Sequence, residues 1–157
     1  MLYPSDKSQL RQYFCDVWQR YRDGTPLQAT EQLIADIIVE HPEYHSLLAN
    51  PQLAIQQTFA SELGQSNPFL HLSIHIAVRE QLQTQRPIGI TQLYQQLLKS
   101  IGNSHDTEHR IMECLAEILW ESQHNGRLPD DASYLEKIQQ MIYHQNKSHK
   151  KSLHSDV

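Results

Sequence analysis

The prolines and glycines of this chain stand where helices begin and end, and this constrains the fold more than any other sequence feature. Three prolines follow a residue that commonly caps a helix, namely Thr25-Pro26, Asn50-Pro51 and Asn67-Pro68. Proline suits the first helical position because the N–H that it lacks has no helical partner there. Four of the five glycines stand where helices should stop: Gly24, Gly64, Gly102 and Gly126. The predicted helices span 6–22, 26–41, 51–63, 67–85, 91–101, 104–124 and 130–144.

An all-α fold follows from this pattern. Five glycines in 157 residues are few for the turns of a β protein, and sustained alternation of β-branched residues is absent from the sequence. We therefore expect a compact bundle of about six to seven helices in a single domain over residues 1–145. Residues 146–157 are rich in lysine, serine and histidine with little to bury, which predicts a disordered tail.

Composition narrows the functional class. The net charge of −5 argues against general nucleic-acid binding. No window approaches the ~18 consecutive apolar residues that a membrane span needs, and the first residues lack the apolar core of a signal peptide. Two cysteines, Cys15 and Cys114, are too few for a disulfide scaffold. We expect a cytoplasmic protein without membrane or nucleic-acid partners, and the sequence indicates no oligomeric state.

Histidine is unusually frequent, with ten in the chain, and several fall on apolar helix faces. His71 and His75 stand one turn apart on the apolar face of one predicted helix. His109 and Glu113 stand one turn apart on another, and His41 aligns with the apolar face of a third. Three separate helices therefore direct polar side chains towards the predicted core.

A spacing of four residues suits metal binding. Side chains four apart on a helix have Cβ atoms ~5–6 Å apart, close enough to share one ion. Imidazole and carboxylate together suit Zn, Fe, Mn or Ni, and helical bundles build such sites from facing helices. The candidate metal ligands are His41, His45, His71, His75, His109 and Glu113. The candidate residues that would hold these ligands in place are Glu31, Tyr44, Glu80 and Glu117.

A second interpretation needs no metal. Buried histidines usually bond to a carbonyl or a carboxylate, and a polar network of histidine and glutamate fixes helix register without any substrate. The sequence thus predicts either a metal-binding bundle or a non-catalytic interaction or structural protein. An open metal position would activate water or oxygen, as in a hydrolase or an oxidoreductase, so both an enzyme and a non-enzyme fit these residues.

Several stretches of the chain resemble one known family. They are His41-Pro42-Glu43-Tyr44-His45, the long segment 67–81, the segment 108–120 and Tyr134-Leu135. Together they resemble an uncharacterised proteobacterial family, the domain of unknown function number 1841, over nearly the whole chain apart from the tail. The resemblance implies a small bacterial cytosolic protein and supplies no activity.

The two helical pairs are also similar to those of hemerythrin-like bundles. Those proteins hold two irons with His-x-x-x-His and His-x-x-x-Glu pairs on antiparallel helices. Here the pair His71/His75 precedes His109/Glu113, the reverse of the order in that family, and its terminal His-x-x-x-x-Asp pair has no clear counterpart. The similarity therefore implies shared bundle chemistry rather than kinship.

Overall fold

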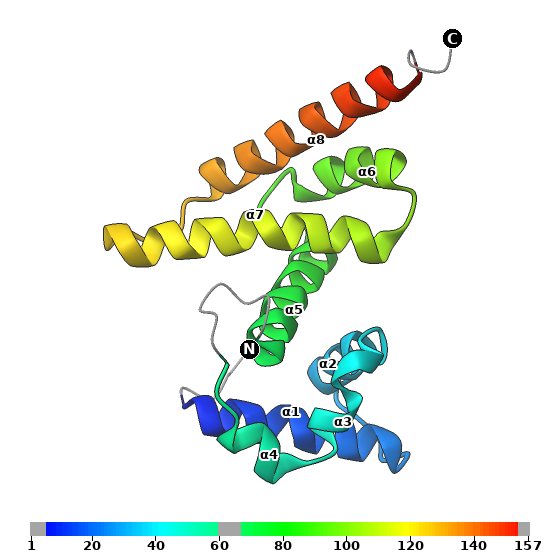
Figure 1. The fold of residues 1–157 in the computed structure, drawn as a ribbon, viewed down its shortest axis with the longest axis vertical. Helices are drawn as coiled ribbons and strands as arrows, with labels where there is room; N and C mark the ends of the chain where they lie inside the picture. The colour runs from blue at the N-terminus through cyan, green and yellow to red at the C-terminus, as the bar shows by residue number, and fades with distance from the viewer. Residues whose placement is uncertain (1–5, 60–66, 154–157) are drawn as a thin grey trace. The chain divides into compact units, whose positions relative to one another are not determined.

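The computed structural model describes residues 6–59 and 67–153, and all regular structure in these ranges is helical (Figure 1). Its α-helices are α1 (Lys7–Arg22), α2 (Ala29–Val39), α3 (His45–Leu48), α4 (Pro51–Gln56), α5 (Pro68–Thr84), α6 (Ile90–Ile101), α7 (Ser104–Asn125) and α8 (Asp131–Leu153). A 3-10 helix, η1 (Pro42–Tyr44), joins α2 to α3. The all-α class is therefore confirmed, with eight α-helices in the described part of the chain.

The chain forms two compact units, one within residues 1–76 and the other within 77–157. Helix α5 contributes its residues up to 76 to the first unit and the remainder to the second. Each unit has its own group of buried apolar side chains. The expectation of one domain over residues 1–145 stays a prediction.

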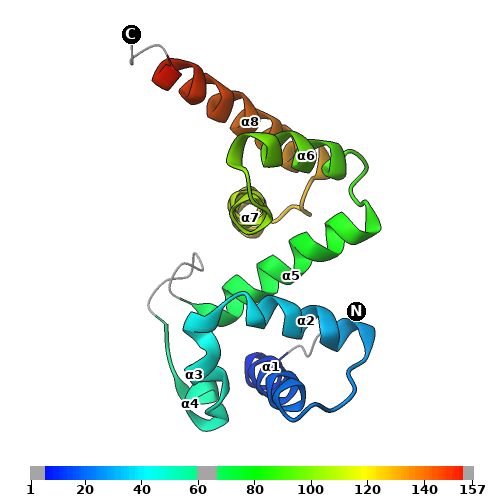
Figure 2. The same ribbon diagram turned by 90° about the vertical axis from the view of Figure 1, so that its right-hand side faces the viewer.

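In the first unit, α1 packs against α2, α3 and α4 (Figure 2). The apolar core there consists of Phe14, Cys15, Val17, Trp18, Ile34, Ala35, Ile37, Ile38, Leu48, Ala54, Phe69, Leu72 and Ile76. These residues recur at helical spacing on α1, α2 and α5, so one face of each helix is buried.

In the second unit, α6, α7 and α8 each pack against the other two (Figure 1). Their buried side chains include Ile90 and Leu97 from α6, Ile111 from α7 and Ile138 from α8. The hydroxyl of Tyr134 donates to Gln81 Oε1 at 2.7 Å and thereby links α8 to the end of α5. None of the described helices combines the length and hydrophobicity needed to cross a lipid bilayer.

Several helix ends follow the predicted cap chemistry. Asn50 accepts from the Leu53 N–H at the start of α4, and Asn67 accepts from two N–H groups at the start of α5. Gly102 and Gly126 end α6 and α7 with φ angles of 94° and 63°, a left-handed conformation that favours glycine. These ends were predicted correctly because each depends on residues within one turn.

Three predicted boundaries in the first unit are wrong, and one of them is the end of α2, which stops at Val39 rather than at 41. Helix α2 begins at Ala29 rather than at 26, because Glu31 accepts the Gln28 N–H and caps the helix there. Helix α4 ends at Gln56, so residues 57–59 are not helical, and the rest of the predicted 51–63 helix lies outside the described residues.

Arg11 explains where α4 ends. Its guanidinium donates to the carbonyls of Ala54 and Gln57, at 3.0 and 2.7 Å, and lies over the rings of Phe59 and Phe69. The last carbonyls of a helix have no helical donor, and here a side chain from α1 supplies one. Because Arg11 lies more than forty residues before these carbonyls, local sequence patterns do not predict the contact.

The predicted disorder of the tail is wrong for residues 146–153, because α8 continues as a helix to Leu153. Ser100 on α6 donates to Asn146 Oδ1 at 2.7 Å, and its carbonyl accepts a hydrogen bond from His149 Nε2 at 3.1 Å. These bonds to α6 supply partners that the composition of the tail does not reveal. Residues 154–157 of the predicted tail lie outside the described part.

Asn103 caps α7, and its loss should destabilise the second unit. Its side chain accepts the Asp106 N–H at 2.9 Å and donates to the Asp106 carboxylate at 2.8 Å. We expect Asn103→Ala to lower the free energy of unfolding by about 1 kcal/mol, measured by urea denaturation, because the cap is lost. Asn103→Ser keeps a capping oxygen and should remain close to the native value; equal losses in both variants would contradict the capping role.

Candidate metal centre

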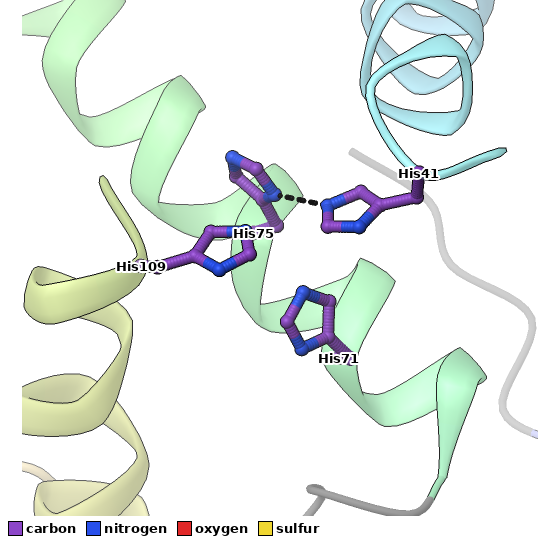
Figure 3. A group of neighbouring side chains, drawn as sticks. All are labelled: His41, His71, His75 and His109. Atoms are coloured by element: carbon purple, nitrogen blue, oxygen red, sulfur yellow. Dashed lines mark hydrogen bonds between the residues drawn. The ribbon is translucent and has the colours of Figure 1, made fainter. Parts of the chain in front are cut away.

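Three imidazoles of the first unit lie together. His41 comes from the turn after α2, and His71 and His75 come from successive turns of α5 (Figure 3). One ring nitrogen of each lies within 4.8 Å of those of the other two. His41 and His75 are fully buried and His71 is half-buried. We call this group of three the histidine triad. It places imidazole nitrogens in the protein interior, where a polar group without a hydrogen-bond partner costs free energy.

Pro42 determines how His41 reaches the triad. A residue before proline is disfavoured in the helical conformation, and His41 has φ −121° and ψ 66°. Its N–H still bonds to the Ile38 carbonyl, and its own carbonyl accepts the Tyr44 N–H, both at 3.0 Å. The chain therefore leaves α2 in a closed turn, and the His41 side chain points towards His75 (Figure 3).

His41 forms a hydrogen bond at each of its two ring nitrogens. Its Nδ1 lies 2.9 Å from Glu43 Oε1, and its Nε2 lies 2.9 Å from His75 Nδ1. Burial raises the pKa of Glu43, but hydrogen bonds from His41 and from the Glu43 backbone outweigh it and hold the pKa below its ordinary value. Glu43 is thus an ionised acceptor at neutral pH.

Tyr44 packs against two members of the triad. Its ring stacks on His41 with centroids 5.3 Å apart, and it meets His71 edge-on at 5.8 Å. Burial raises the pKa of the Tyr44 phenol, and the charge of Glu43 raises it further, so the phenol stays protonated at neutral pH. The structure thus places Tyr44, a predicted supporting residue, in direct contact with the triad.

The model of the family Domain of unknown function (DUF1841) matches residues 6–140, a range that includes the triad and Glu43. The chain belongs to this family. The resemblance seen in the sequence is thereby confirmed. Comparison with curated proteins and with solved structures gave no match.

The structure does not bring His45 into the triad. Its Nε2 donates to the Ile38 carbonyl at 2.7 Å, near the end of α2, and its ring lies 4.3 Å from the Trp18 ring. A carbonyl only accepts, so this bond requires a hydrogen on Nε2. His45 therefore caps α2 and packs on α1.

His109 and Glu113 belong to the second unit. The His109 ring lies beside that of His105, one turn earlier on α7, with centroids 4.1 Å apart. Glu113 is exposed and accepts a hydrogen bond from Arg110 at 3.2 Å. As metal ligands, both residues stay predictions from the sequence.

Two of the three predicted supporting carboxylates form ion pairs of their own. Glu31 forms an ion pair with Arg20 in the first unit, and Glu117 pairs with Lys137 in the second. Glu80 is half-buried on the part of α5 that belongs to the second unit. The roles assigned to these three carboxylates stay predictions.

Glu43 is the carboxylate hydrogen-bonded to His41 Nδ1, and the sequence does not single it out as a supporting residue. A local signal for it exists. Pro42 begins η1, and a tight turn that starts at proline brings the residue after it close to the residue before it. The His-Pro-Glu order therefore points to a hydrogen bond between His41 and Glu43.

Proposed function

We propose that this protein binds a transition-metal ion through His41, His71 and His75. The observation that carries the proposal is the convergence of three imidazole nitrogens, from a turn and a helix, within 4.8 Å of one another. Neutral imidazole is a good ligand for Zn, Fe and Ni and a poorer one for Mn, so the first three are the favoured ions.

The spacing of the triad agrees with a tetrahedral ion. Two nitrogens bound at the usual Zn–N distance of about 2.0–2.1 Å lie about 3.3 Å apart. His41 Nε2 and His75 Nδ1 are 2.9 Å apart, slightly closer than that value. These two nitrogens are therefore close to the separation that a shared ion requires.

Three protein ligands are the number found at catalytic zinc sites, where the fourth position is open to water or substrate. A metal held in this way acts as a Lewis acid and lowers the pKa of the bound water. The sequence predicts His109 and Glu113 as additional ligands. Three protein ligands favour a catalytic role, because one metal position stays open. Four protein ligands favour a structural role, because no position stays open.

A metal-free role is the second candidate. It is favoured by the hydrogen bonds that join Glu43 to His41 and His41 to His75, because these already form a connected buried network. Such a network fixes one arrangement of the helices without any ligand. The protein would then act in structure or interaction rather than in catalysis.

Metal analysis distinguishes the two candidates. We expect untagged protein, purified without chelator, to contain a stoichiometric transition metal by elemental analysis. After metal removal, titration with Zn²⁺, Fe²⁺, Mn²⁺ and Ni²⁺ should raise the melting temperature, since an ion at 100 times its Kd stabilises the native state by about 2.7 kcal/mol. Absence of co-purified metal together with an unchanged melting temperature would rule out the metal proposal and leave the polar network.

A further inference from the structure

We propose that Glu43 is the positioning residue of the metal centre, holding His41 in the tautomer that directs the Nε2 lone pair at the metal. This inference rests on the proposed function and assigns the coordinating atom of His41 and of His75. Glu43 itself does not touch the ion.

The tautomer follows from the hydrogen bond to Glu43. An ionised carboxylate has only acceptor sites, so the His41 Nδ1 that lies 2.9 Å from Glu43 Oε1 carries the hydrogen. The other nitrogen of a neutral imidazole then has a free lone pair. In His41 this nitrogen is Nε2, which faces His75 (Figure 3).

The coordinating atoms follow in turn. His41 Nε2 is an acceptor, so in the metal-free protein His75 Nδ1 donates to it across 2.9 Å. A metal ion bound here would take both lone pairs, Nε2 of His41 and Nδ1 of His75, and the hydrogen on His75 Nδ1 would pass to solvent or to the other ring nitrogen. His41 would keep its hydrogen on Nδ1, bonded to Glu43.

The turn around Glu43 is built to hold this arrangement. Pro42 opens η1, and the Tyr44 N–H bonds to the His41 carbonyl at 3.0 Å, so Glu43 lies inside a closed turn. The Tyr44 ring stacks on one face of His41 while the carboxylate bonds to its edge. The ring is thus restrained in both tilt and rotation.

A carboxylate in this position also strengthens the ligand. Metal-bound histidine usually donates its second N–H to such a partner, which raises its basicity, and removal of the partner typically costs 10–100-fold in metal affinity. The Glu43 side chain is 55% exposed, whereas that of His41 is 1% exposed. Glu43 is therefore replaceable without a buried cavity, and the effect on the metal is measurable apart from folding.

The test compares Zn²⁺ affinity in Glu43→Ala, Glu43→Gln and a control, Asp36→Asn. Asp36 is exposed on α2 and bonds to Gln32, so its replacement removes one charge from the same unit without touching the triad. We expect about a 10–100-fold weaker Kd for Glu43→Ala, a smaller loss for Glu43→Gln, whose amide oxygen still accepts, and less than twofold for Asp36→Asn. Native affinity in Glu43→Ala would overturn the inference and leave the metal proposal intact.

Histidine tautomers give a second readout, which does not depend on metal binding. In ¹⁵N-resolved spectra of the metal-free protein, His41 should be protonated on Nδ1 in the native chain and in Glu43→Gln, and should lose this preference in Glu43→Ala. On Zn²⁺ addition, His75 should lose the hydrogen from Nδ1, whereas His41 should keep its own. If His41 of the native chain is protonated on Nε2, the inference is wrong whether or not the protein binds a metal. Failure of the inference is therefore distinguishable from failure of the proposed function.

Discussion

Replacement of His75 by alanine is expected to weaken Zn²⁺ binding by at least about 100-fold, or about 2.8 kcal/mol at 1.4 kcal/mol per tenfold. His75 is fully buried, and its Nδ1 faces His41 Nε2 at 2.9 Å, so its removal leaves two imidazoles that do not enclose an ion. Isothermal titration of the metal-free protein measures the change. His71→Ala should show a loss of similar size.

Controls separate lost ligation from lost folding. His75→Gln keeps a polar side chain of similar size, so the variant retains a partner for His41 while losing the imidazole. His144 is exposed on α8, and His144→Ala should bind Zn²⁺ like the native chain. Native affinity in both His75 variants would refute the triad as the metal site. His109→Ala and Glu113→Ala, titrated in parallel, test the two further ligands that the sequence predicts.

In the second unit, replacement of Glu108 by alanine is expected to lower the free energy of unfolding by about 3–5 kcal/mol. Arg79 donates to Glu108 Oε2 from Nε at 2.9 Å and from Nη2 at 2.7 Å, and the two side chains are 19% and 6% exposed. Loss of the carboxylate removes both of these charge-assisted hydrogen bonds from a largely dehydrated guanidinium. Urea denaturation monitored by circular dichroism measures the effect.

An exposed pair on the same helix provides the matched control. Glu113 accepts from Arg110 at 3.2 Å, and these side chains are 58% and 44% exposed. Glu113→Ala should cost less than about 1 kcal/mol, because water screens an exposed pair and hydrates the remaining charge. If Glu108→Ala costs no more than Glu113→Ala, the Arg79–Glu108 pair does not stabilise the second unit.

Helix ends show how far local sequence chemistry reaches. The Asn-Pro caps of α4 and α5 and the glycines that end α6 and α7 were predictable, because a cap satisfies backbone groups within three or four residues. Thr25-Pro26 has the same chemistry but does not begin a helix, since α2 begins at Ala29, where Glu31 accepts the Gln28 N–H. The sequence offers both Thr25-Pro26 and Glu31 as signals for the start of this helix, and the folded structure shows which one is used.

Long-range contacts decided the boundaries that local chemistry did not. Arg11 reaches carbonyls more than forty residues away, where α4 ends at Gln56. Hydrogen bonds between Ser100 and the side chains of Asn146 and His149 accompany the extension of α8 through a segment whose composition predicted disorder. Composition describes what a segment can bury on its own, and it omits partners contributed by another helix.

The candidate site was likewise predictable from the sequence only in part. The sequence by itself determined the all-α class, through its prolines and glycines at helix ends. It also determined that His71 and His75 share one face, because residues four apart on a helix lie one turn apart. Only the tertiary structure decided that His41 joins them while His45, four residues later, bonds to the Ile38 carbonyl instead. The reason is the turn at Pro42: once the chain leaves the helix, side-chain direction depends on individual backbone angles and on the neighbours that packing supplies.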